Sequence, residues 1–356
     1  MNALKKDTVL STKIKNDKLF LSIVIPCWNC SETIERLLDS IVEQNPSFKF
    51  EVIIQDDYSS DNFMEKVEKY KDKLDIKYFK NKPREIHCPG NTRMDGLANT
   101  SGEWVTFIDN DDILEPNALS EFYNCVVYNH ETTLVLSYFR EYFPETDQYG
   151  KIYDNNNNIT WLHGKFYNKE FLKKYEINFK EDLKSHEDLY FNQCVFSTIA
   201  SENLNYSILN MFTYKWVYNP KSLSRSMFYN DVEFYIDIYY DEYIMASTDP
   251  WLKVYDRHPE SRDKIFDREC YVLLYSFFYY QSLYMRNGFK HHKRNRDIFE
   301  NFLNDIKKRY NATNNDIINK IYSNSDMYNK TRREAMDGCA GGLIECHTFK
   351  DFINLF

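Results

Sequence analysis

The chain has 356 residues, of which 43% are hydrophobic and 17% are aromatic. This composition excludes an intrinsically disordered chain and predicts an ordered globular protein of about two domains. The net charge of -9 argues against a protein that binds nucleic acid mainly through electrostatic attraction.

The first segments of the sequence follow an order that is typical of a buried parallel sheet. Residues 1–18 are polar, and we expect them to form a loose arm. Residues 19–26 form an apolar run that ends in Pro, which is typical of a buried parallel strand. After the turn at residues 27–30, we expect Ser31 to be the N-cap of a helix, because acidic residues follow it in the first turn.

The alternation of strands and helices continues to residue 108. Further strands are expected at 50–55, 75–79 and 104–108, and helices at about 62–70 and 93–98. This alternation predicts an α/β fold with a doubly wound, mainly parallel sheet that is flanked by helices. In such sheets the ligand binds beyond the carboxyl ends of the strands.

The later part of the sequence is mixed and then becomes helical. We expect a strand at 134–139 and a polar turn at 149–158. Long helical patterns rich in Tyr, Phe and acidic residues predict a mainly helical C-terminal region at 229–356, which would contact an acceptor or another subunit. The predicted units are therefore the arm, a domain at 19–228 and this helical region.

Neither the cysteines nor the apolar segments indicate a secreted or membrane-spanning protein. The eight cysteines are scattered, and the pair Cys27 and Cys30 lacks a second pair at zinc-binding distance. The N-terminus lacks the apolar core of a signal peptide, and the run at 271–285 is too short and too aromatic to cross a bilayer. We expect a cytoplasmic protein, either free or peripheral at the inner face of the membrane.

Three carboxylates, Asp109, Asp111 and Asp112, lie within four residues directly after the strand at 104–108. At a strand end they can share Mg²⁺ or Mn²⁺, which prefer carboxylate and phosphate oxygens. Such an ion would neutralise a diphosphate leaving group. The alternative is a solvated acidic turn that caps the next helix.

Two earlier turns are predicted to face the same crevice. Asp56 and Asp57 follow the strand at 50–55, where a carboxylate can accept a hydrogen bond from a uracil imide or a ribose hydroxyl. In the turn after the first strand, Trp28 offers a ring that can stack on a base, and Asn29 offers an amide. Trp28 as a plain packing residue is the alternative.

Taken in order, these motifs resemble the family-2 glycosyltransferases of the GT-A fold. The resemblance covers roughly residues 20–225. It is carried by Ile25-Pro26-x-Trp28-Asn29, Asp56-Asp57-x-Ser59-x-Asp61, Arg93 ahead of Gly96, Gly102 to Asp112, Leu162 to Tyr167 and Ser185 to Phe191. The chain departs from the family in having Met94 after Arg93, where Asn is usual, and Trp28 where Tyr is commoner.

The resemblance implies a role for each matching residue. Asp111, with Asp109, would hold the metal ion, which is Mn²⁺ or Mg²⁺. Asp188, beside Glu187, would be the general base that deprotonates the acceptor, unless this acidic pair only complements a helix N-terminus. The residues implied to bind the nucleotide sugar are Pro26, Trp28, Asn29, Asp57, Arg93, Asp109, Asn110 and Arg225. For Arg225, which would clamp the diphosphate from a loop, the alternative is an ordinary surface arginine.

The predicted activity is metal-dependent, inverting transfer of one sugar from a UDP-sugar to a hydroxyl group. The expected acceptor is a cell-envelope glycan such as capsule, lipopolysaccharide or teichoic acid. The Gln-x-x-Arg-Trp motif of processive family members is absent, which favours transfer of a single sugar. Alternatives are glycosylation of modified DNA bases or of a protein, and an inactive scaffold that binds a sugar nucleotide or a glycan.

A basic run and an aromatic stretch near the C-terminus could contact binding partners of the protein. The basic run from Lys290 to Arg296 indicates either contact with an anionic acceptor or surface, or a solvated helix end. The aromatic stretch at 271–284 indicates either core packing or a homodimer interface.

Overall fold

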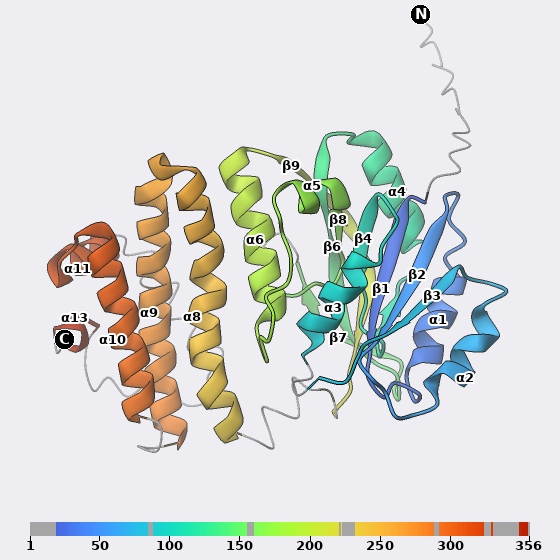
Figure 1. Cartoon of the computed structure of the whole chain (residues 1–356), viewed down its shortest axis with the longest axis horizontal. Coiled ribbons are helices and arrows are strands. Elements are labelled where there is room, and N and C mark those ends of the chain that lie inside the picture. The colour runs from blue at the N-terminus through green and yellow to red at the C-terminus, as the bar shows by residue number, and fades with distance from the viewer. Residues whose placement is uncertain are drawn as a thin grey trace, which may run out of the picture.

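A mixed, mainly parallel sheet flanked by helices forms most of the molecule, and a group of helices lies beside it (Figure 1). The computed structural model describes residues 19–84, 88–154, 160–220, 222, 232–287, 292–323, 329 and 349–354. The predicted fold class, including the helical C-terminal region, is confirmed. The arm at 1–18 and the boundary between residues 228 and 229 lie outside the described residues, so the division into domains stays a prediction.

The first half of the sheet is parallel. β1 lies at its centre and pairs with β2 on one side and β4 on the other, while β3 extends the sheet beyond β2. Every residue of β1 is buried, which explains why a continuous apolar run predicts this strand. The four strands are β1 (Leu21–Cys27), β2 (Phe50–Asp56), β3 (Ile76–Lys80) and β4 (Trp104–Phe107).

The second half of the sheet mixes strand directions. The complete order is β3-β2-β1-β4-β8-β6-β9-β5, with β7 paired to β6. β8 is antiparallel to both β4 and β6, β9 runs parallel to β6, and β5 is antiparallel to β9. The strands of this half are β5 (Ile113–Leu114), β6 (Thr132–Phe143), β7 (Gln148–Tyr153), β8 (Lys165–Asn168) and β9 (Asn205–Val217).

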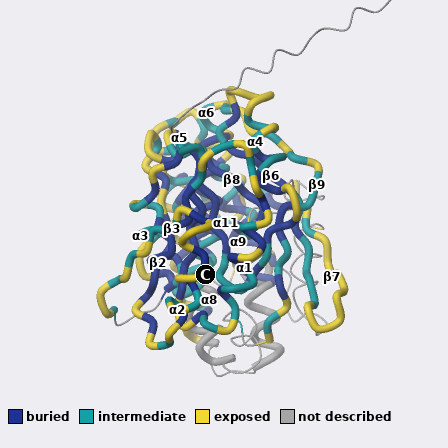
Figure 2. The backbone as a smooth tube through the Cα atoms, turned by 90° about the vertical axis from the view of Figure 1, so that its right-hand side faces the viewer, coloured by how far each residue is buried: buried dark blue, intermediate teal, exposed yellow. Residues whose placement is uncertain are grey.

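Helices cover both faces of the sheet, and the buried strands lie between them (Figure 2). Ile23 of β1 packs in the apolar core that includes α1, α2 and α4, whereas the next residue, Val24, packs in the core that includes α5 and α6. Gly96 lets α3 approach β1, because a Cβ there would lie 2.5 Å from Cγ1 of Val24. These helices are α1 (Ile34–Val42), α2 (Phe63–Val67, continued by η1, Glu68–Tyr70), α3 (Pro89–Ala98), α4 (Ala118–Tyr128), α5 (Lys169–Lys174) and α6 (Glu187–Glu202).

The C-terminal helices have an apolar core of their own, which includes Phe277 and Phe299. α8 packs along α6 and so connects this group to the sheet. In the part of the chain that the structure describes, no helix has both the length and the apolar character needed to cross a bilayer. The elements are α8 (Val232–Arg257), η2 (Pro259–Ser261), α9 (Arg262–Asn287), α10 (His292–Tyr310), α11 (Asn314–Ser323) and α13 (Phe349–Ile353).

Two local predictions were wrong. The N-cap of α1 is Thr33 and not Ser31, because the backbone N–H of Ser31 donates to a carboxylate oxygen of Asp61 at 2.8 Å and residues 31–33 form a turn. The polar segment predicted as a turn at 149–158 is strand β7 as far as Tyr153, and residues 155–159 lie outside the described part. β7 has one partner strand, so its largely exposed side chains give no apolar signal.

Candidate active site

Three turns meet at one edge of the sheet because the strands that precede them are parallel. Cys27 at the end of β1 lies opposite Asp56 at the end of β2. Val24 of β1 lies opposite Phe107, the last residue of β4. The turns after β1, β2 and β4 therefore open at the same edge, which is where an α/β sheet binds its ligand.

Asn29 ties the first turn to the second. Its side-chain oxygen accepts hydrogen bonds from the backbone N–H groups of Ser60 at 2.9 Å and Asp61 at 3.3 Å, and its own N–H donates to the Ser59 hydroxyl at 2.9 Å. Its φ of 50° lies in the left-handed region, which Asn adopts more readily than most residues. Next to it, Trp28 is 55% exposed.

The neighbouring carboxylates Asp56 and Asp57 are both buried but have different surroundings. Asp56 accepts hydrogen bonds from the Tyr78 hydroxyl at 2.7 Å and from the N–H of Ser59 at 2.8 Å, so it fixes the turn. The Asp57 carboxylate accepts from the Asn81 side chain at 3.2 Å, and the Asp57 N–H donates to Cys27 at 2.8 Å. Of the two, Asp57 is the one implied by the resemblance to contact the nucleotide.

Asn110 joins the turn after β4 to the end of β1. Its amide nitrogen donates to the carbonyl of Pro26 at 2.9 Å, and its oxygen accepts from the Thr33 hydroxyl at 3.0 Å. The next residue, Asp111, accepts a hydrogen bond from the Asn219 side chain at 3.1 Å, and its backbone carbonyl accepts one from Arg36. The predicted Pro26 and Asn110 therefore lie in contact, and Asp111 binds Asn219, two residues after the end of β9.

Arg93 of α3 brings together three carboxylates from two distant segments. Its Nη2 donates to Asp109 at 2.6 Å, and its Nη1 donates to Glu187 at 2.9 Å and to Asp188 at 3.1 Å. Arg93 is only 5% exposed. A buried guanidinium surrounded in this way connects the turn after β4 to the start of α6.

These carboxylates differ in proton affinity. Burial alone would raise the pKa of Asp109, but the Arg93 guanidinium outweighs it and holds that pKa below its ordinary value. For Asp188, burial dominates and, together with Glu187 and Asp109, raises the pKa well above its usual range against the opposing effect of Arg93. Asp188 is therefore much the better proton acceptor, which is the property a general base needs.

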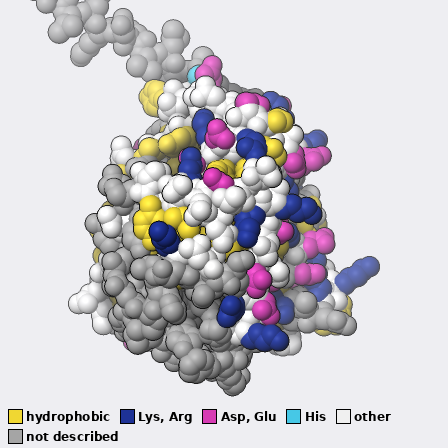
Figure 3. All heavy atoms as spheres, turned by 90° about the vertical axis from the view of Figure 1, so that its left-hand side faces the viewer, with side chains coloured by type: hydrophobic (Ala, Val, Ile, Leu, Met, Phe, Trp, Pro, Cys, Tyr) yellow, Lys and Arg dark blue, Asp and Glu magenta, His cyan; other side chains and the backbone are white. Residues whose placement is uncertain are grey.

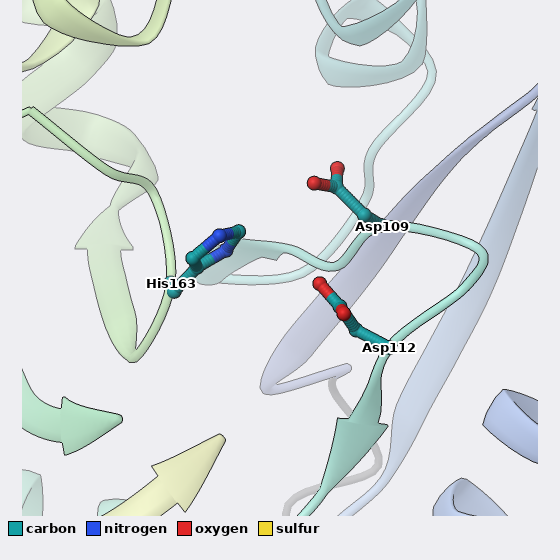
Figure 4. Close-up of side chains that lie close together, drawn as sticks. All are labelled: Asp109, Asp112 and His163. Atoms are coloured by element: carbon teal, nitrogen blue, oxygen red, sulfur yellow. The ribbon is translucent and has the colours of Figure 1, made fainter. Parts of the chain in front are cut away.

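Figure 4 shows a second group in which Asp109, Asp112 and His163 converge. Their ligand atoms all lie within 4.8 Å of one another. The Asp112 oxygens accept hydrogen bonds from the Tyr214 hydroxyl at 2.5 Å and from the N–H of Val217 at 2.8 Å, and each oxygen keeps a further lone pair. Burial lowers the pKa of His163 to about 4, so its imidazole is neutral at pH 7.

Two carboxylates and a neutral imidazole form a donor set that suits a divalent cation, so this group could hold a metal ion. The predicted ligand Asp109 belongs to it, whereas the predicted ligand Asp111 does not. Sequence reasoning counted Asp112 among the three carboxylates that can share an ion, but it assigned no ligand role to His163. The available signal for His163 was its position in a segment that already resembled the family.

The structure describes only some of the basic residues for which the sequence predicts a role. Arg225 lies outside the described residues, as do Lys290 and His291. On α10, Lys293 and Arg294 are exposed, whereas Asn295 is buried. On the face formed by the C-terminal helices, the described acidic and basic side chains are intermingled, and they do not gather into one positive patch (Figure 3).

Known proteins resemble this chain in sequence. The model of the family "Glycosyl transferase family 2" matches residues 22–184. The chain is similar to the poly(ribitol-phosphate) beta-N-acetylglucosaminyltransferase TarS of Staphylococcus aureus, with 31% identity over 48% of this chain and 31% of TarS. It is also similar to TarP of the same species, with 28% identity over 59% of this chain and 66% of TarP. The chain thus matches about a third of the length of TarS.

The fold is also that of a solved structure. The crystal structure of S. aureus TarS 1–349 in complex with UDP-GlcNAc has a TM-score of 0.66 and 20% identity, covering 90% of this chain and 93% of that one. The complex of the same fragment with UDP has a TM-score of 0.61 and 21% identity. At these identities the likeness shows the fold.

Proposed function

The chain belongs to glycosyl transferase family 2, and on this premise we propose that it transfers one sugar from a UDP-sugar to a hydroxyl group of a polyol-phosphate polymer of the cell wall. The observation that carries the proposal is the position of Arg93, which bonds Asp109 at the end of β4 and also Glu187 and Asp188 at the start of α6. One side chain thus joins the proposed donor site to the proposed proton acceptor. The acceptor class follows the relatives, whose names state poly(ribitol-phosphate) as their substrate.

In this proposal the UDP moiety lies across the turns after β1 and β2. The exposed ring of Trp28 stacks on uracil, and Asp57 accepts a hydrogen bond from the base or the ribose. Asn29 and Asn110 act through the shape of these turns, because their side chains already bind neighbouring segments. Pro26 contributes in the same way through its carbonyl group.

Asp188 is the general base in this proposal. It removes the proton of the acceptor hydroxyl while the oxygen attacks the anomeric carbon in line with the departing UDP, so one base and one leaving group suffice for inversion. Burial raises the pKa of Asp188, so its ionised carboxylate binds a proton more tightly than an ordinary aspartate does. A Mn²⁺ or Mg²⁺ ion held by Asp109, with Asp111 or with Asp112 and His163, would offset the charge of the diphosphate.

The direct test uses the purified full chain with UDP-GlcNAc or UDP-glucose, Mn²⁺, and poly(ribitol phosphate) as acceptor. We expect UDP release that depends on the polymer, together with labelled sugar in the polymer fraction. Binding of UDP without transfer to any hydroxyl acceptor would support the scaffold alternative. Lack of binding to both UDP-sugars would contradict the proposed donor.

A further inference from the structure

The turn that leads into α6 has an unusual backbone. Asp182 and His186 both have φ of 60°, in the left-handed region, and His186 is directly followed by Glu187 and Asp188. His186 is the N-cap of α6, but its side chain makes no capping hydrogen bond. Asp and His enter this region more readily than most residues, but it still costs about 1–3 kcal/mol for each of them, so contacts from elsewhere are needed to hold the turn.

One set of these contacts comes from α3. The side-chain nitrogen of Asn91 donates to the Asp182 carboxylate at 3.0 Å, and the Asp182 N–H donates back to the Asn91 oxygen at 3.0 Å. Gly90 lies against the first turn of α6, since a Cβ on it would lie 2.8 Å from Cβ of Glu187. Arg93, two residues after Asn91, then bonds Glu187 and Asp188.

The other set comes from α8 in the C-terminal helical region. The Glu242 carboxylate accepts the backbone N–H of Lys184 through Oε1 at 3.1 Å and that of Ser185 through Oε2 at 2.7 Å. The Ser185 hydroxyl also donates to Oε2 at 3.0 Å and lies 2.8 Å from Nδ1 of His186. The ring of Tyr243, next to Glu242, contacts the His186 ring edge-on, with centroids 5.7 Å apart.

We infer that Glu242 is a positioning residue for the Glu187 and Asp188 pair, so that the C-terminal helices complete the active site. The inference rests on the proposed function of that pair. A carboxylate has acceptor sites on both oxygens, and here it satisfies two successive N–H groups at the residues that precede the pair. It thereby fixes the direction in which α6 begins, and with it the place of the Asp188 carboxylate.

Other contacts between α8 and its neighbours provide a matched control. Asp249 lies on the same helix and pairs with Lys180 at 2.8 Å, but this pair is more than a third exposed. It holds α8 near the same segment without touching Lys184 or Ser185. The variant Asp249→Asn therefore removes one carboxylate from α8 in the same way as Glu242→Gln does.

The decisive variant is Glu242→Gln, because an amide offers one acceptor oxygen and presents an NH₂ group to the second N–H. With UDP-GlcNAc and poly(ribitol phosphate), we expect kcat to fall by about tenfold or more, since small displacements of reacting groups are costly, while KM for UDP-GlcNAc stays within about twofold. Amide hydrogen exchange at residues 184–188 should become faster. Glu242→Asp keeps the charge on a shorter side chain. It should therefore restore part of the kcat and part of the slow amide hydrogen exchange at residues 184–188.

The readouts separate this inference from the proposed function. If the wild-type chain transfers no sugar but exchange at 184–188 accelerates in Glu242→Gln and not in Asp249→Asn, the positioning of the turn is supported while the proposed activity fails. Unchanged exchange and unchanged kcat in Glu242→Gln would overturn the inference. Equal effects of Glu242→Gln and Asp249→Asn would also overturn it, because they would reduce Glu242 to one contact of the helix interface.

Discussion

Nη1 of Arg93 lies 3.1 Å from Oδ1 of Asp188, a residue 95 positions away in the chain. The pair joins α3 to α6, and both side chains are largely removed from solvent. Because Asp109 and Glu187 bond the same guanidinium, its removal leaves three carboxylates close together without their shared hydrogen-bond donor. Arg93 is therefore needed for the stability of the site as well as for its geometry.

We expect Arg93→Met to lower the free energy of unfolding by about 3–5 kcal/mol, which is the usual cost of removing one partner of a buried ion pair. Chemical denaturation at pH 7 measures this change. In the control Arg84→Met, which breaks a partly exposed pair with Asp95, the loss should be at most about 1 kcal/mol. Similar losses in the two variants would show that the three carboxylates do not depend on Arg93.

Asp188→Asn should abolish transfer and preserve donor binding. Loss of a general base typically lowers the rate by about 10²- to 10⁴-fold, whereas the turns after β1 and β2 do not involve this side chain. Because burial raises the pKa of Asp188, its ionised form opposes folding at pH 7, and the Asn variant should be at least as stable as the wild type. Titration calorimetry with UDP and a transfer assay test the two statements, and normal transfer would remove Asp188 as the base.

Asp111→Asn separates the two candidate metal sites. The Asp111 carboxylate accepts one hydrogen bond from Asn219, so the variant should melt within a few degrees of the wild type. If Asp111 is a ligand, Mn²⁺-dependent turnover of the UDP-sugar should be lost, and this is the outcome we expect. Unchanged turnover would exclude Asp111 and leave Asp109, Asp112 and His163 as the ligands.

The contribution of His258 to stability should depend on pH. The hydrogen bond with Glu202, at 2.8 Å, raises the pKa of His258 above its ordinary value of about 6.5. The stabilisation is thus complete below the unfolded pKa and is lost as the pH rises through the folded one. In thermal unfolding, His258→Gln should melt earlier than the wild type at pH 6 but not at pH 9.

The central strand Leu21–Cys27 could be predicted because burial on both faces makes it a continuous apolar run. The edge strand Gln148–Tyr153 could not, because it has one partner strand and largely exposed side chains. The helix start at Thr33 was missed because Asp61, far along the chain, binds the N–H of Ser31. Local patterns carry no information about such partners.

The same limit applies to the site. That the turns after β1, β2 and β4 share an edge follows from the parallel alternation and could be inferred from sequence. The proximity of His163 to Asp109, and the clamp of Glu242 on Lys184 and Ser185, depend on packing between segments more than fifty residues apart. No periodicity or spacing encodes those contacts.

The exposure of Trp28 gives the protein a natural optical reporter. Indole emission changes when another aromatic ring stacks on it, so occupancy of the first turn can be followed by intrinsic fluorescence without a label. Trp104 is enclosed in the core, and its emission should change on unfolding. Replacing Trp28 by Phe would therefore remove the contribution of Trp28 to the signal of nucleotide binding and keep the emission of Trp104 as a report on the fold.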